Sequence, residues 1–202
     1  TAALLRSTGH SAYAVTLTGL GERVHLGSEH TNLETHIADV INLLEYEDLH
    51  DVVLVAHSYS GIVATGVADR VGQRLAQVVF VDTGPFESGM AYLDFSPPEA
   101  QQQVRDAVGS GWRYALPSFE VLEQQASLEG VSDSDRARFR MLSAPQTFGT
   151  YTQPLQLAGA PVSGDYGRHV ITCSFTKEKL ETLAASGEMK PLGLLATPGW
   201  HI

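Results

Sequence analysis

Three short apolar runs divide the chain. They occupy residues 52–55, 78–81 and 170–174, and they show little of the alternation of a half-exposed strand. Such runs predict strands that are buried on both faces. Between the first two, residues 62–71 form a segment rich in small and apolar residues that predicts a helix. This alternation of strand and helix predicts an α/β protein with a doubly wound, mostly parallel sheet and helices on both faces.

The same patterns predict the flanking elements. Residues 1–6 have the composition of the end of a helix, and residues 11–17 alternate as in a strand. A capping box at 31–34 begins an amphipathic helix that runs to about Tyr46. Its apolar positions are Leu33, Ile37, Val40, Ile41 and Leu44. After Thr176 we expect a helix with Leu180 and Leu183 inward that ends at Gly187, and a last strand begins at 199–202.

Residues 87–156 lack strand patterns and contain three helix starts, at 96–99, 117–120 and 133–135. We therefore expect one domain over 1–202, with 87–156 inserted as a helical cap after the strand that ends at Asp82. The insertion would lie at the sheet end where parallel α/β proteins bind ligands. Its large apolar residues either form a wall of the site or only pack the insertion onto the sheet. They are Trp112, Tyr114, Phe119, Phe139, Met141, Leu142 and Phe148.

Charge and composition narrow the function classes. The 202 residues carry a formal net charge of −10 and no run of basic residues, which excludes a typical nucleic-acid binder. No apolar stretch has the length of a membrane span, and no export signal is visible, so we expect a cytoplasmic protein with a small neutral substrate. A homodimer is left open. The single cysteine, Cys173, excludes a disulfide framework and is expected to be buried.

The first apolar run leads into Ala56-His57-Ser58-Tyr59-Ser60-Gly61. A serine with small residues two positions before and after it is typical of a nucleophile elbow, because a tight strand-to-helix turn leaves no room for larger side chains. Only Ser58 fits this spacing, and Gly61 would let the following helix pack closely. The pattern predicts that Ser58 is a covalent nucleophile; the alternative is a polar turn after a strand.

A serine nucleophile needs an oxyanion donor, an acid and a base. The backbone N–H of Tyr59 is one predicted oxyanion donor, and we expect the second in a loop after an earlier strand, upstream of Thr1. We prefer Asp82 as the acid because it closes the neighbouring strand; the rival is Glu178, and an Asx turn is the alternative role of Asp82. In nucleophile–acid–base order only His169 and His201 remain as bases. His169 precedes its predicted strand and His201 enters the last one, so we expect the base beyond Ile202.

Two further histidines and one tryptophan are candidates for binding rather than for proton transfer. His57 adjoins the nucleophile but points the other way, which favours a packing role. His25 lies in the loop after the first predicted strand, where it either lines the site or is solvated. Trp112 of the insertion is the candidate for the substrate wall. We expect no metal site.

The chain resembles the α/β-hydrolase superfamily, in the bacterial esterase-like branch related to salicylate and methyl-ester esterases and hydroxynitrile lyases. The resemblance rests on residues 16–26, 35–40, 53–61 and 81–82 with the insertion that follows. It implies a cofactor-free Ser-Asp-His hydrolase of small carboxylic esters. Members also begin with a strand and a His-Gly loop and end with a Gly-His pair, which implies that the chain is truncated at both ends; the usual acid after Cys173 is also missing.

Three functions therefore compete. The first is an esterase that forms an acyl-enzyme on Ser58. The second is a hydroxynitrile-lyase-like enzyme in which the serine only transfers protons. The third is a non-catalytic binding homologue, which the missing acid and terminal histidine favour. We also expect the 202-residue chain to be poorly stable and weakly active, since the incomplete sheet would expose apolar faces.

Overall fold

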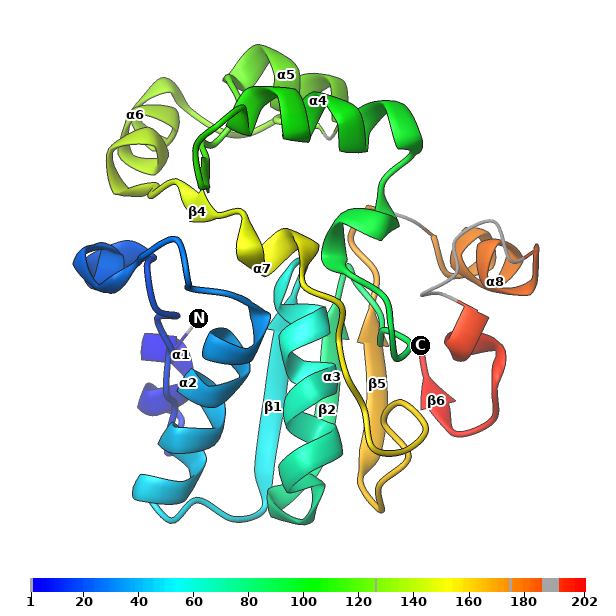
Figure 1. Ribbon diagram of the computed structural model, residues 1–202. Helices are drawn as coiled ribbons and strands as arrows, with labels where there is room; N and C mark the ends of the chain where they lie inside the picture. The colour runs from blue at the N-terminus through cyan, green and yellow to red at the C-terminus, as the bar shows by residue number, and fades with distance from the viewer. Residues whose placement is uncertain (1, 126, 175, 187–192) are drawn as a thin grey trace.

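A four-stranded parallel sheet forms the centre of the protein. The computed structural model describes residues 2–125, 127–174, 176–186 and 193–202. The strands are β1 (Val52–His57), β2 (Leu75–Val81), β5 (Gly167–Ile171) and β6 (Trp200–His201), in the order β1-β2-β5-β6. Every neighbouring pair is parallel. This arrangement confirms the predicted α/β fold with a mostly parallel sheet (Figure 1).

Helices α2 (Leu33–Tyr46) and α3 (Ser60–Val71) lie side by side on one face of the sheet (Figure 1). Both were predicted, but α2 is capped by Asn32 and Thr35, one residue later than expected, because the Asn32 side chain accepts from the Thr35 amide. The core between helices and sheet includes Leu33, Ile37, Ile62, Val67, Val78 and Phe80, none more than 1% exposed. Burial of these side chains, at about 25 cal/mol per Å², is the main force that holds α2 and α3 in place.

The opposite face of β1 is not covered by the described residues. Val53 is 51% exposed and Val55 is 60% exposed, while Ala56 of the same strand is buried. The prediction of a strand buried on both faces was therefore wrong for β1. Successive side chains of a strand point to opposite faces, and only the face toward α3 has a partner here. The exposure of Val53 and Val55 agrees with the prediction that the sheet would expose apolar surface.

Residues 11–17 do not form a strand, although they alternate as one. The chain leaves α1 (Ala2–Ser7) and runs as extended coil to the short helix η1 (Gly21–Leu26). Tyr13 and Val15 remain 48% and 39% exposed. A strand requires a ladder partner, and no described strand lies beside this segment. The alternation of a strand is thus present in residues 11–17, but none of the described strands provides the hydrogen-bonded neighbour that a strand requires.

The segment after β2 carries three helices above the carboxyl ends of the strands (Figure 1). They are α4 (Pro98–Val108), α5 (Phe119–Gln125) and α6 (Asp133–Leu142), each near a predicted start. Shorter elements connect them to the sheet: η3 (Tyr92–Phe95), an antiparallel pair of β3 (Arg113–Tyr114) and β4 (Gln146–Thr147), and α7 (Gly149–Thr152). In Figure 1, α7 lies between the upper helices and the end of β1.

The carboxyl-terminal part follows the predicted order with shifted boundaries. β5 ends at Ile171, because residues 172–174 turn away toward the end of β2. Cys173 is exposed in this turn, so its predicted burial was wrong. Helix α8 (Lys177–Ser186) buries Leu180, and the predicted stop at Gly187 lies outside the described residues. The short helices η2 (Gly72–Arg74) and η4 (Leu194–Ala196) precede β2 and β6. No helix in the described ranges has the length and apolarity to cross a bilayer.

Candidate active site

Ser58 occupies a sharp turn between β1 and α3. Its φ of +50° is in the left-handed region, which a non-glycine residue adopts only at a cost of about 1–2 kcal/mol. The turn is held by backbone hydrogen bonds from the Ser58 amide to the Val81 carbonyl at 3.3 Å and from the Gly61 amide to the Ser58 carbonyl at 2.9 Å. Ser58 is half-buried, so its hydroxyl is neither sealed in the core nor on an open helix face. This strained, reachable geometry is the geometry that the spacing of small residues predicted.

Ser60 stabilises the turn from the other side. Its hydroxyl donates to the His57 carbonyl at 2.6 Å and accepts from the His57 amide at 2.8 Å. Ser60 therefore bonds with the backbone that precedes Ser58, and the serine at plus two has a structural partner within the elbow. The His57 side chain itself is exposed on the uncovered face of β1.

Asp82 follows β2 directly and joins the ends of two strands. Its amide donates to the Ile171 carbonyl at 2.8 Å, and its Oδ1 accepts from the amides of Cys173 at 3.1 Å and Ser174 at 2.9 Å. The Ser174 hydroxyl donates to Oδ2. Partial burial by itself would raise the pKa of Asp82, but the Ser174 and Cys173 donors and the nearby His57 outweigh it and lower this pKa. The carboxylate is thus held ionised with one acceptor position on Oδ2 left over.

The Tyr59 side chain is anchored by a buried histidine. His36 of α2 is 1% exposed, and its Nε2 lies 2.9 Å from the Thr18 carbonyl oxygen while its Nδ1 lies 2.8 Å from the Tyr59 hydroxyl. A carbonyl only accepts, so Nε2 carries the proton and Nδ1 accepts from the tyrosine. Burial raises the pKa of Tyr59, which keeps the phenol protonated as this donor. The residue after the nucleophile is therefore tied to the loop that contains Thr18.

Asp39 holds that loop in place from the next turn of α2. Its Oδ2 accepts from the Thr18 amide at 2.6 Å, and its Oδ1 accepts from the Thr18 hydroxyl and from Arg23 at 2.9 Å each. Arg23 also donates to the Thr16 carbonyl at 2.8 Å. The two sequence runs 16–26 and 35–40, far from the elbow in sequence, thus form a single hydrogen-bonded support beneath Tyr59.

His36 makes the stability of this support dependent on pH. Burial is the largest cause that lowers the pKa of His36 below its ordinary value of 6.5; Arg23 adds to this, and the Thr18 carbonyl and Asp39 oppose it. The unfolded chain therefore binds a proton near pH 6.5 that the folded chain does not bind. We expect the contribution of neutral His36 to the free energy of unfolding to be complete above pH 6.5. This contribution should decrease as the pH drops from 6.5 toward the lower pKa of His36 in the folded protein.

Denaturant unfolding at pH 7.5, 6.5 and 5.5 measures this effect. His36→Gln keeps a donor and an acceptor but does not titrate, so its loss between pH 6.5 and 5.5 should be smaller than that of the unmodified protein. His30, whose side chain is 88% exposed, provides the control: His30→Gln should keep the unmodified pH dependence. Equal pH dependence in all three proteins would contradict this role of His36.

Tyr92 lies at the start of η3, in the segment that follows β2, and its side chain reaches the nucleophile. Its hydroxyl lies 3.5 Å from Ser58 Oγ. Its ring packs edge-on against Tyr59 at 5.1 Å and against Tyr151 of α7 at 5.2 Å. Tyr92 was missed in the sequence analysis because it lies 34 residues after Ser58 in a segment without strand or motif patterns; no local signal marks it.

Other predicted site residues lie elsewhere. His25 is exposed in η1 with Nδ1 3.2 Å from the Glu22 carbonyl oxygen, which agrees with the solvated alternative. Trp112 stacks against the Arg113 guanidinium at 4.0 Å, so its ring is occupied by a neighbouring side chain of its own segment. Glu178 is exposed in the first turn of α8, where its own amide and Thr176 lower its pKa, so it behaves as a helix-capping residue.

The two histidines considered as bases form a pair away from the elbow. His169 of β5 and His201 of β6 are in register, and their rings stack at 4.9 Å with an angle of 21° between them. His169 lies inside its strand rather than before it, since β5 begins three residues earlier than predicted. In the part of the chain that the structure describes, no histidine nitrogen is hydrogen-bonded to Ser58 Oγ or to the Asp82 carboxylate.

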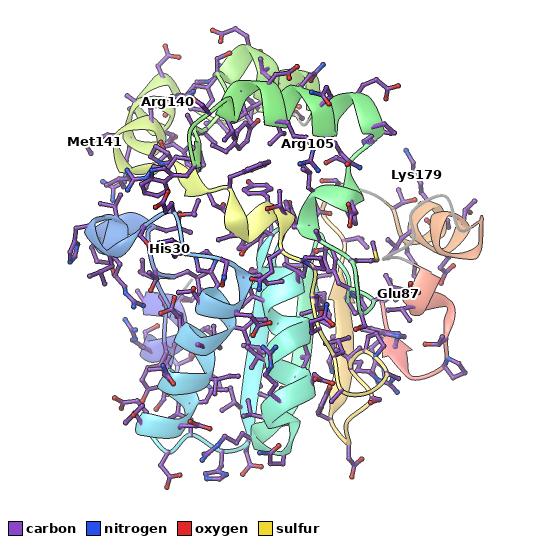
Figure 2. The ribbon with its side chains drawn as sticks, in the orientation of Figure 1. His30, Glu87, Arg105, Arg140, Met141 and Lys179 are labelled. Carbon is purple, nitrogen blue, oxygen red and sulfur yellow. The ribbon has the colours of Figure 1, made fainter. Side chains whose placement is uncertain are left out.

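The apolar residues expected as a wall do not lie together: Phe119 packs against Phe139 at 6.3 Å, and Phe148 lies against the Arg105 guanidinium at 5.9 Å. Tyr114 packs against Tyr151 at 5.8 Å and so belongs to the tyrosine cluster around Tyr92. By contrast, Phe139, Met141 and Leu142 of α6 are 56%, 72% and 57% exposed. Figure 2 places Met141 at the outer edge of the molecule, away from the sheet. These three residues neither line the site nor pack the insertion onto the sheet.

The described residues contain no group of three or more histidine, cysteine, aspartate and glutamate side chains arranged to hold a metal ion. The groups that the structure places around the elbow are a hydroxyl, a carboxylate, tyrosine hydroxyls and backbone amides. These groups suit acyl transfer to a serine.

Known proteins are similar to this chain in sequence or in fold. A profile described as "Alpha/beta hydrolase family" matches residues 2–197. A carbendazim hydrolyzing esterase from Nocardioides sp. (strain SG-4G) is 37% identical over 213 residues, which cover 100% of this chain and 82% of that protein. An extracellular alpha/beta-hydrolase from a Paenibacillus species superimposes with a TM-score of 0.72 at 24% identity, over 85% of this chain and 69% of that chain. A methylesterase from Arabidopsis superimposes with a TM-score of 0.65 at 18% identity, over 94% and 78%.

Proposed function

The chain belongs to the alpha/beta-hydrolase family and is a carboxylic ester hydrolase, and we propose that it cleaves small esters through an acyl-enzyme on Ser58. The observation that carries the proposal is the turn at Ser58, where a non-glycine φ of +50° presents a half-buried hydroxyl at the end of β1. Strained backbone of this kind persists only where surrounding structure holds it, and it concentrates at functional sites. The 37% identical relative is named an esterase, which supports the reaction class.

The nucleophile and one oxyanion donor of this reaction are Ser58 and Tyr59 of the described chain. Ser58 Oγ attacks the ester carbonyl carbon, its proton passes to a histidine base, and the carbonyl electron pair moves to the oxygen. The Tyr59 N–H, at the start of α3, donates to this oxyanion. When the intermediate collapses, the alcohol leaves with the proton from the base. Water then attacks the acyl-serine by the same route and releases the acid.

Asp82 has the role of orienting the base. Its carboxylate is fixed by the Ser174 hydroxyl and the amides of Cys173 and Ser174, and it stays ionised. A fixed carboxylate with one free acceptor position is what an imidazole N–H requires for a single tautomer. The Asx turn considered as an alternative role of Asp82 is not what the carboxylate forms, because its hydrogen bonds go to Cys173 and Ser174. This structural role, which joins the end of β2 to the turn after β5, is compatible with the catalytic role because the two use different lone pairs.

Trapping of the acyl-enzyme tests the proposal. On mixing with p-nitrophenyl acetate, we expect a burst of about one equivalent of p-nitrophenolate followed by slower turnover. Mass spectrometry of an acid-quenched sample should place the acetyl group on the peptide that contains Ser58. A lyase in which the serine only moves protons would form no acetyl-serine, and a non-catalytic homologue would release no p-nitrophenolate above the buffer rate. Either result would contradict the proposal.

A further inference from the structure

The peptide group between Ser58 and Tyr59 determines where the proposed oxyanion donor points. This peptide bond is trans, so the Tyr59 N–H lies in the plane of the Ser58 carbonyl and points the opposite way. The carbonyl accepts from the Gly61 amide at 2.9 Å, at the start of α3. The Tyr59 N–H is therefore directed away from the first turn of α3, at a helix end whose amides have no intrahelical acceptor.

The Ser58 side of this peptide group is held by backbone hydrogen bonds, but it is also strained. Ser58 has a φ of +50°, and its amide donates to the Val81 carbonyl at 3.3 Å. A strained torsion persists only where the surrounding structure keeps the neighbouring peptide group from rotating. Tyr59, on the other side, has φ −47° and ψ −37° and makes no side-chain capping bond to α3. Its side chain is held by a different helix.

That helix is α2, which reaches Tyr59 through the buried His36. The Tyr59 hydroxyl donates to His36 Nδ1 at 2.8 Å, and the two rings meet edge-on with their centroids 5.7 Å apart. His36 is 1% exposed, and its Nε2 donates to the Thr18 carbonyl at 2.9 Å. Asp39, three residues further along α2, accepts from both the amide and the hydroxyl of Thr18. The Tyr59 side chain thus ends on an imidazole that is itself fixed.

The tether between Tyr59 and His36 differs from ordinary core packing. A phenol and an imidazole cost free energy to bury even when they are paired, whereas an apolar pair could fill such a space without that cost. The rings of Tyr92 and Tyr151 contact Tyr59 from the insertion, at 5.1 Å and 5.9 Å. Rotation of the Ser58–Tyr59 peptide group would therefore have to move a side chain that is enclosed by rings and bonded at its tip.

We propose that His36 is a positioning residue that fixes the Tyr59 N–H in its oxyanion-binding orientation through the Tyr59 hydroxyl. The inference rests on the proposed acyl-enzyme mechanism, and His36 acts through Tyr59 without being a catalytic residue itself. An oxyanion donor is effective when its direction is set before charge develops on the substrate. The tether should therefore stabilise the tetrahedral intermediate and leave the binding of the unreacted ester unchanged.

Tyr59→Phe and His36→Leu each break the tether and keep the Tyr59 N–H. We expect each to lower kcat/KM for p-nitrophenyl acetate about tenfold through kcat, with KM nearly unchanged. This loss is smaller than the roughly 10²–10³-fold that follows removal of a donor, because the N–H is displaced and not deleted. Both changes remove the same hydrogen bond, so the double variant should lose little more than the weaker of the two single variants. Tyr59→Phe decides the matter alone if His36→Leu does not fold.

Leu44→Val is the matched control for a general loosening of α2. Leu44 is 3% exposed and lies on the same buried face about two turns after His36. Loss of one buried methylene should lower the unfolding temperature about as much as Tyr59→Phe does, but it leaves the tether in place. We therefore expect Leu44→Val to keep kcat/KM within about threefold of the unmodified protein.

Two inhibitors separate the positioning of the N–H from a change in the shape of the site. With 2,2,2-trifluoroacetophenone, Ser58 Oγ adds to the carbonyl carbon, the electron pair moves to the oxygen and the serine proton passes to the base. Acetophenone carries the same ring but stays a planar ketone. In Tyr59→Phe the Ki of the trifluoroketone should rise by the factor that kcat/KM falls, and the Ki of acetophenone should not change. Equal weakening of both inhibitors, an unchanged kcat/KM, or an equal loss of activity in Leu44→Val would overturn the proposal.

The failure of this inference differs from the failure of the proposed function. If the unmodified protein forms acetyl-Ser58 and Tyr59→Phe keeps its kcat/KM, the acyl-enzyme mechanism stands and His36 has only a structural role. If the unmodified protein releases no p-nitrophenolate above the buffer rate and forms no acetyl-serine, the proposed function is wrong and the positioning role of His36 falls with it.

Discussion

Replacement of Ser58 by alanine is expected to lower kcat/KM for p-nitrophenyl acetate by about 10⁴-fold or more, because it removes the atom that forms the covalent bond. Binding and oxyanion donors would remain, and these groups alone leave only a small residual rate over water. The fold should persist, since the Ser58 backbone bonds to Val81 and Gly61 do not use the hydroxyl. The measurement is the steady-state rate together with loss of acetylation in the mass spectrum.

Ser60→Ala is the matched control, two residues along the same turn. Among the described residues its hydroxyl bonds only with the His57 backbone, so its removal should cost about 1 kcal/mol of stability and leave kcat/KM within about threefold. The contrast separates a nucleophile from a turn-forming serine. If Ser58→Ala kept the activity, or if Ser60→Ala lost as much of it, the elbow would not carry the reaction.

The elbow was predictable because its cause is local. A strand that ends in a cramped turn excludes large side chains at two fixed positions, and Ala56, Ser58 and Ser60 meet this condition within five residues. The backbone at Ser58 and at Asp82 is left-handed, with φ of +50° and +51°. The fold class was predictable for a similar reason, since the alternation of strand and helix and the family resemblance both depend on contiguous runs.

The sequence contains a signal for the hydrogen-bonded support beneath Tyr59, and it lies in the helical periodicity of α2. Leu33, His36, Ile37, Val40 and Leu44 all lie on the buried side of α2, so His36 sits in an apolar stripe. A histidine at such a position must find partners for both nitrogens, which identifies it as part of a polar network. The partners themselves, Thr18 and Tyr59, lie 18 and 23 residues away and follow only from the packing.

Features that depend on a neighbouring element could not be predicted from the sequence. Residues 11–17 have the alternation of a strand but no ladder partner in the described ranges, and Val53 and Val55 have β propensity but no covering helix. β5 ends at Ile171 because the amides of Cys173 and Ser174 bond to Asp82, a residue 91 and 92 positions away. These three errors arose where a long-range contact, rather than local sequence, decides the structure; the one-residue shift of the α2 cap is instead a local one.

Substitution of Gly61 by alanine is expected to destabilise the protein by about 2 kcal/mol, through crowding between α3 and the end of β2. A Cβ at Gly61 would lie 2.9 Å from Thr83 Cγ2 and 3.0 Å from the Gly84 carbonyl oxygen. Thr83 and Gly84 directly follow Asp82, and Gly84 meets the new atom with backbone, which cannot rotate away. The displacement should therefore lower the unfolding temperature by about 4–8 °C and reduce acetylation of Ser58 at the same time.

Gly66→Ala is the matched control, because Gly66 is also buried within α3 and gains the same helix propensity from alanine. A Cβ there would overlap Ile37 Cδ1 and lie 3.0 Å from Ile37 Cγ1 and 3.2 Å from Leu155 Cδ1, all of them side-chain atoms rather than backbone. Because side chains can shift where backbone cannot, the loss should be smaller than in Gly61→Ala and the elbow should stay in place. Equal unfolding temperatures for the two variants would show that the close approach at Gly61 does not support the turn. A larger loss in Gly61→Ala, accompanied by slower acetylation, would show that one backbone contact positions both the nucleophile and the carboxylate.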